Sequence, residues 1–111
     1  MIESWELIAK ESENHDCHVD MISERLRVTG GWVVRTIASR WKAGTAIAQT
    51  FIADVEGHWK PYWRPISKQG EVPHTEVLTD EMITPAGTLI RTVTSRYEAG
   101  VALEQTLLPL S

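Results

Sequence analysis

The sequence contains the same segment twice. Residues 18–54 align without a gap on residues 74–110, at a constant offset of 56 residues. The match is densest from Gly31 to Asp54, where ten of 24 positions are identical to their counterparts. Agreement at that density, in register, is typical of a duplicated supersecondary unit. The duplication constrains architecture more than chemistry, because an asymmetric active site has no need to occur in both copies.

Composition points to one globular domain. The chain has 111 residues, of which 42% are hydrophobic, and a formal net charge of −4. No run approaches the roughly 18 apolar residues that can span a bilayer, and the acidic start lacks the features of a secretion signal. The acidic balance disfavours nucleic-acid binding. The single Cys17 cannot form an internal disulfide and fits a reducing compartment. We therefore expect a cytoplasmic protein without a membrane or nucleic-acid partner.

Each repeat is predicted to be a three-stranded antiparallel meander. The turn signals at residues 29–31 and 42–44 recur at residues 85–87 and 98–100, and every one ends in Gly. This pattern is typical of three-residue hairpin loops whose last residue has a positive φ. The segments between them are rich in β-branched and aromatic residues, as strands are.

Those loop lengths predict a pairing register. Arg25 would lie opposite Arg35, and Glu81 opposite Arg91. Two facing guanidinium groups favour an anion or a partner's carboxylate between them. The candidate anion-binding or ligand-binding residues are Arg25, Arg35, Gln49, Arg91 and Gln105. The same register predicts two apolar rows, Leu26 with Val34 and Ile52, and Met82 with Ile90 and Leu108.

The N-terminus is expected to be helical. Ser4 is a suitable N-cap, and Trp5, Ile8 and Ala9 have helical spacing up to Glu11. The fold class is therefore mainly β (α+β), with two duplicated three-stranded antiparallel meanders in approximate two-fold symmetry and one N-terminal helix. We expect a single domain, residues 1–111. Its expected parts are residues 1–17 (helix and turn), 18–54 (first meander), 55–73 (connector) and 74–111 (second meander).

The connector holds the most distinctive unrepeated residues. Pro61 and Pro65 disfavour a helix or a central strand there. Its aromatic residues either plug one end of the sheet or anchor a partner, since Trp, Tyr and Arg are common interface anchors. The candidate partner-binding residues are Trp59, Tyr62, Trp63 and Arg64.

The only metal-ligand chemistry is crowded into one short segment. His15, Cys17 and His18 have no matching second pair of ligands, as a structural zinc site would require. A solvated turn is the favoured interpretation. Cys17 lacks a defined histidine partner for nucleophilic catalysis. We therefore assign no metal site, cofactor or catalytic residue.

Two resemblances can be stated. Gly30-Gly-Trp-Val-Val-Arg-Thr, with Gln49-Thr-Phe-Ile-Ala-Asp54 and His58-Trp59, resembles a pattern in small bacterial and phage proteins of undefined function. The second repeat, with Leu89-Ile-Arg-Thr-Val and Gln105-Thr-Leu-Leu-Pro109, is similar to the central hairpin of chorismate lyase and GntR-type effector domains. That resemblance implies a bound aromatic carboxylate held by Arg91, although Gln105 stands where the family has a second arginine.

We expect a non-catalytic protein-interaction module, either an accessory subunit or an inhibitor that docks on a larger protein or assembly. The alternative is a protein that binds an aromatic carboxylate, or a chorismate-lyase-like enzyme. Meanders end in edge strands with unpaired backbone groups. A homodimer formed by edge pairing or face packing is therefore also expected.

Overall fold

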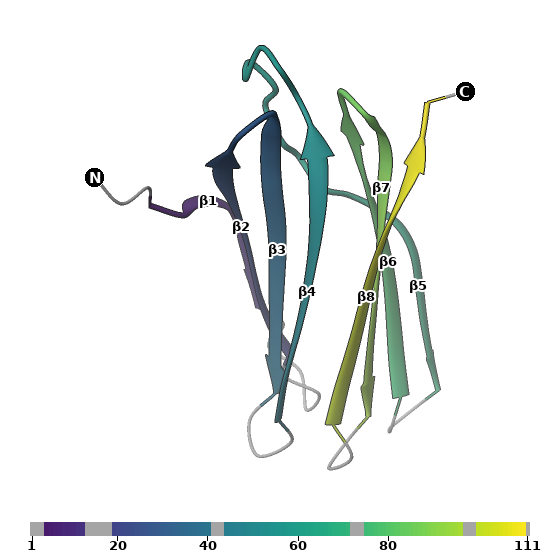
Figure 1. Cartoon of the computed structure of the whole chain (residues 1–111). Coiled ribbons are helices and arrows are strands. Elements are labelled where there is room, and N and C mark those ends of the chain that lie inside the picture. The colour runs from purple at the N-terminus through teal and green to yellow at the C-terminus, as the bar shows by residue number, and fades with distance from the viewer. Residues whose placement is uncertain (1–3, 13–18, 41–43, 72–74, 97–99, 111) are drawn as a thin grey trace.

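The computed structural model describes residues 4–12, 19–40, 44–71, 75–96 and 100–110, and these residues form a mainly β molecule (Figure 1). They make two four-stranded antiparallel sheets, ordered β1-β2-β3-β4 (sheet 1) and β5-β6-β7-β8 (sheet 2). The strands are β1 Glu6–Ser12, β2 Val19–Val28, β3 Gly31–Arg40, β4 Gly44–Ala53, β5 Arg64–Glu71, β6 Thr75–Thr84, β7 Gly87–Arg96 and β8 Gly100–Pro109. The two sheets face each other, and their edge strands β4 and β8 run side by side (Figure 1).

The predicted N-terminal helix is wrong, because its residues form β1. This strand pairs antiparallel with β2, and its register shifts between Leu7 and Ala9. The shift lets two successive residues, Ile8 and Ala9, both pack against the core. A β-bulge therefore produced the spacing that suggested a helix.

The predicted three-stranded meanders are also wrong, because each repeat has a fourth strand. Part of the expected connector forms β5, which pairs with β6 as β1 pairs with β2. Its register shifts between Pro65 and Ser67, 58 residues after the shift in β1. Trp63 corresponds to Trp5 at the same offset, and Ile66 corresponds to Ile8. The duplicated unit is thus a four-stranded meander that begins with a tryptophan.

The first hairpin of each repeat has a two-residue loop, which moves the register from the predicted one. Val28 pairs with Gly31, so Leu26 lies opposite Val33 and not Val34. Gly31 begins a strand because a Cβ there would lie 2.1 Å from the carbonyl oxygen of Ile52. The third strands are displaced too, since Val34 pairs with Thr50 rather than Ile52.

The same displacements occur in repeat 2, where the predicted row of Met82, Ile90 and Leu108 is not formed. Met82 pairs with Leu89, and Ile90 pairs with Thr106. The expected positive φ at Gly44 and Gly100 is confirmed, at 117° and 120°.

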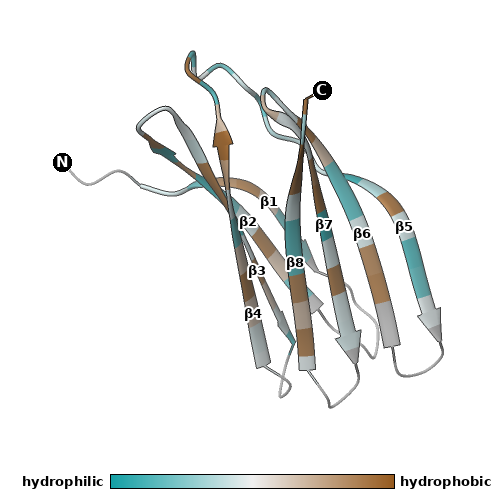
Figure 2. Cartoon of the chain, turned by 45° about the vertical axis from the view of Figure 1, so that its right-hand side comes forward, coloured by the Kyte–Doolittle hydropathy of each residue, from teal (hydrophilic) through white to brown (hydrophobic). Residues whose placement is uncertain are grey.

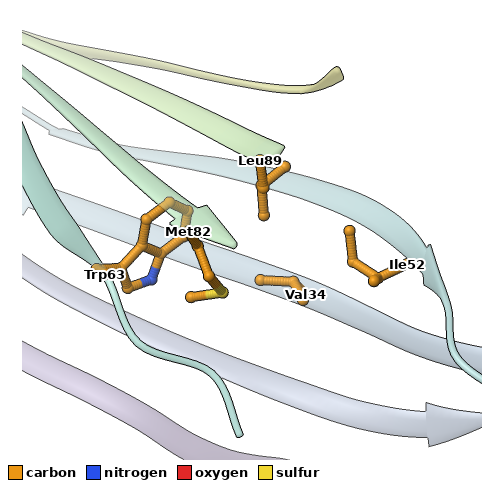
Figure 3. Packing of buried hydrophobic residues seen from close by; sticks show 5 residues of the cluster. All are labelled: Val34, Ile52, Trp63, Met82 and Leu89. Atoms are coloured by element: carbon orange, nitrogen blue, oxygen red, sulfur yellow. The ribbon is translucent and has the colours of Figure 1, made fainter. Parts of the chain in front are cut away.

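The core lies between the two sheets. Val34 and Ile52 of sheet 1 pack with Met82 and Leu89 of sheet 2, and Trp63 closes one side of this cluster (Figure 3). A second cluster joins Met21 and Ala38 to Val93. Apolar burial between two sheet faces is the main stabilising contribution in such a sandwich.

The two repeats bury opposite faces. In β3 the buried side chains include Val34 and Thr36, whereas Arg35 points to the other side of sheet 1. In β7 the buried side chains are Leu89, Arg91, Val93 and Ser95, which correspond to residues 33, 35, 37 and 39 of β3. We call the side that bears Arg35 or Arg91 the arginine face, and the side that bears Thr36 or Thr92 the threonine face.

The sheets therefore stack face to back. The threonine face of sheet 1 covers the arginine face of sheet 2. A two-fold axis between the sheets would place equivalent residues on both sides of the contact. The expected two-fold relation is wrong for that reason.

Candidate functional site

Arg91 is the centre of the contact between the sheets. Its side chain has no exposed surface, and its Nη2 donates to Asp80 Oδ2 at 2.8 Å and to Glu11 Oε1 at 3.2 Å. Nη1 lies 3.3 Å from Ser23 Oγ and 3.4 Å from Thr36 Oγ1, both on sheet 1. The carboxylate opposite Arg91 is Asp80, not the predicted Glu81, because of the one-residue change in register.

Two further side chains complete this contact. The Trp63 ring stacks on the Arg91 guanidinium at 4.0 Å, and the Trp63 Nε1 donates to Ser23 Oγ at 3.0 Å. Gln105 accepts from Thr36 Oγ1 and donates through Nε2 to Thr50 Oγ1 at 3.2 Å. Arg91 and Gln105 are thus brought together, but both are occupied in joining the sheets. A ligand would reach Arg91 only if the sheets separated.

Arg35 makes the equivalent contacts on the outward arginine face of sheet 1. Its Nη2 donates to Glu24 Oε1 at 2.6 Å, and its guanidinium lies 3.7 Å from the Trp5 ring. Glu24, Arg35 and Trp5 therefore repeat Asp80, Arg91 and Trp63. The expectation that Arg35 faces Arg25 is wrong, because Glu24 occupies that position. Gln49 lies beside Arg35 on β4 and is exposed.

Arg25 lies on the threonine face of sheet 1, away from Arg35. It pairs with Glu6 at 3.1 Å and stacks on the Trp32 ring at 3.8 Å. Its Nη1 also donates to the Trp59 carbonyl at 2.6 Å. Arg25 therefore anchors the connector to sheet 1, and it does not share a site with Arg35.

Apolar rows flank the polar row on each arginine face. On sheet 1 they are Leu26, Val33 and Phe51 on one side, and Ile22, Ile37 and Ile47 on the other. The matching rows on sheet 2 are Met82, Leu89 and Leu107, and Leu78, Val93 and Leu103. The rows on sheet 2 line the core, whereas those on sheet 1 face outward.

The outward rows leave much apolar surface uncovered within the described residues. Leu7 and Ile47 are each 60% exposed, and Phe51 is 50% exposed. Apolar segments along these strands are visible in Figure 2. An apolar patch on one face of a sheet marks a binding surface more often than isolated apolar residues do. Sequence analysis missed these residues because it did not ask which face of each copy is covered.

The candidate partner-binding residues of the connector separate into two groups. Trp63 is buried, and Trp59 is partly buried with its Nε1 donating to the Ile83 carbonyl at 2.9 Å. Tyr62 and Arg64 are exposed, and Arg64 pairs with Glu81. These two border a shallow hollow lined by Lys60, Tyr62, Arg64, Glu81 and Ile83.

Asp54 holds the start of the connector in place. Its Oδ2 accepts from the Trp32 Nε1 at 2.9 Å, and its Oδ1 accepts from the Gly57 amide at 3.0 Å. The hydrogen bond from Trp32, with the Gly57 and Trp59 amides and the nearby Arg27, lowers the Asp54 pKa below its ordinary value despite desolvation. The role of Asp54 is accounted for by this local structure.

His15, Cys17 and His18 lie outside the described residues. Within the described residues no helix is long and apolar enough to cross a membrane. No family model, curated protein or solved structure matches the chain.

Proposed function

We propose that the chain is a non-catalytic protein-interaction module that docks through the arginine face of sheet 1. The observation that supports this is the outward position of a face whose duplicate is buried. On sheet 2 the same pattern of residues contributes to a core. On sheet 1 its apolar rows meet solvent, although burial of each large apolar side chain is favourable by about 1.5–3 kcal/mol.

The polar row suits a protein surface better than a small anion. The Arg35 guanidinium already has a carboxylate and an aromatic ring beside it, which leaves only its Nε without a hydrogen-bond partner among the described residues. Arg91 has carboxylate and hydroxyl partners and no exposed surface. These contacts count against the alternative of aromatic-carboxylate binding or lyase activity.

An accessory subunit or an inhibitor that docks on a larger assembly would use such a face. The connector contributes Tyr62 and Arg64 as a second exposed group of interface residue types. We also propose a cytoplasmic location, because the lone Cys17 fits a reducing compartment.

Photo-crosslinking in cells tests this function. Ile47 is replaced by p-benzoylphenylalanine, which places an apolar photo-reactive group on the outward face. The same group at Glu56, an exposed connector position, is the control. We expect protein adducts from position 47 and few from position 56. Equal or absent adducts at position 47 would refute docking through this face, whereas adducts with any protein, including the chain itself, would support it.

A further inference from the structure

Each molecule already contains one example of a complete contact for this face. The threonine face of sheet 1 covers the arginine face of sheet 2 through Arg91 and Gln105. The two faces left outward are the arginine face of sheet 1 and the threonine face of sheet 2. They are the same two kinds of surface that meet inside the molecule.

The outward threonine face keeps the hydrogen-bonding groups of its buried equivalent. Inside the molecule, Arg91 and Gln105 contact three hydroxyl residues of sheet 1, namely Ser23, Thr36 and Thr50. The corresponding residues of sheet 2 are Thr79, Thr92 and Thr106. All three retain the hydroxyl, and they lie on the outer side of sheet 2.

We propose that the chain associates with further copies of itself head to tail. The arginine face of sheet 1 in one copy packs on the threonine face of sheet 2 in the next, repeating the contact found inside each molecule. This proposal rests on the proposed function and names the partner of the same surface. Arg35 and Gln49 take the parts that Arg91 and Gln105 take within the molecule, with Thr79, Thr92 and Thr106 of the neighbouring copy as their partners.

Charge is complementary across the proposed contact. The outward threonine face carries the exposed carboxylate of Glu104, which lies beside Thr92. The outward arginine face carries Arg35 and the exposed Lys10, which lies beside Ile22. Opposite charges on the two surfaces favour this orientation over the packing of two identical faces.

The contact joins two different surfaces, so one pairing leaves a free surface at each end. Such a heterologous contact produces a ring if the rotation between neighbours closes, and an open array if it does not. Two-fold dimers, by contrast, stop at two copies. The expected signature is therefore assembly beyond a dimer, with a mass that rises with concentration until a ring closes.

Two complementary variants test the proposal. The first, I47E/F51E, places charge on the arginine face of sheet 1, where both side chains are at least half exposed. The second, A102R/T106R, places charge and bulk on the threonine face of sheet 2, where both residues are exposed. Val55→Glu is the control, since Val55 is 84% exposed on the connector and belongs to neither face. Circular dichroism checks that each variant is folded.

Sedimentation velocity of the separate and mixed proteins gives the result. We expect the wild type and Val55→Glu to form assemblies at high micromolar concentration, and each double variant to remain a monomer. A mixture of the two double variants retains one intact contact and should form a 1:1 heterodimer that cannot extend.

Other outcomes would overturn the proposal. Persistent dimers of A102R/T106R alone would indicate pairing of identical arginine faces. A wild type that stays monomeric throughout the range would exclude a second copy as the partner. In that case crosslinks from position 47 to another protein would leave the proposed function standing, and their absence would remove both.

Discussion

The duplicated arginines allow a matched measurement of what burial does to the same set of contacts. Arg91 and Arg35 each have a carboxylate and a tryptophan ring as partners, but their side chains are 0% and 24% exposed. We predict that Arg91→Met destabilises the protein much more than Arg35→Met. Methionine preserves most of the apolar stem, so the comparison reports mainly on the charge and its hydrogen bonds.

The magnitude follows from what each substitution leaves behind. Without Arg91, the Asp80 carboxylate, 10% exposed, loses the cation that compensates its burial. Removing one partner of a buried pair typically costs about 3–5 kcal/mol. Glu24 is 22% exposed and can be hydrated, so loss of Arg35 should cost about 1 kcal/mol or less.

Urea unfolding followed by tryptophan fluorescence measures both losses, at a protein concentration below that of any self-association. Asp80→Asn in the Arg91→Met background should recover part of the stability, because it removes the unpaired carboxylate. Equal losses for the two arginine variants, or further destabilisation by Asp80→Asn, would refute this account of the contact.

Three further predictions concern the connector and the turns. Trp63→Ala should lower the free energy of unfolding by about 3–5 kcal/mol, as for other buried aromatic residues, whereas Tyr62→Ala should change it by less than about 0.5 kcal/mol in the same denaturation assay. Gly87→Ala should reduce the melting temperature more than Gly44→Ala. Both have positive φ, but only at Gly87 would the new Cβ meet a carbonyl oxygen, at 2.1 Å. Because its folded-state pKa is lowered, Asp54 stabilises the fold above the ordinary carboxyl pKa, and this contribution is lost as pH falls through the lowered value. Asp54→Asn should therefore show a weaker loss of stability on acidification, and an unchanged acid profile would contradict that assignment.

The duplication and the antiparallel β class could be predicted from the sequence, because the turn signals and the matched residues are local. The first strand could not, for two reasons. Its bulge gives Trp5, Ile8 and Ala9 a helical spacing. Its match to β5 has an offset of 58 rather than 56 residues, so a gapless alignment assigns Trp63 no counterpart.

The candidate site was harder to predict because hairpin register decides which charges meet. A loop shorter by one residue exchanges Arg25 for Glu24 opposite Arg35. The glycines that suggested a longer loop are needed elsewhere, since Gly31 permits the close approach of a neighbouring carbonyl. Local sequence cannot distinguish a glycine required by φ from one required by space.

Face-to-back stacking explains why both faces of each repeat carry a mixture of apolar and polar residues. If the two sheets met through one kind of face, the other kind could be polar throughout. Here each kind of face is buried in one copy and outward in the other, so both must be able to pack. Sequence similarity between the copies preserves that ability on the outward faces, where Phe51 and Ile47 remain apolar and Thr92 and Thr106 keep their hydroxyls. The duplication that forms the core thus also leaves two complementary surfaces for association.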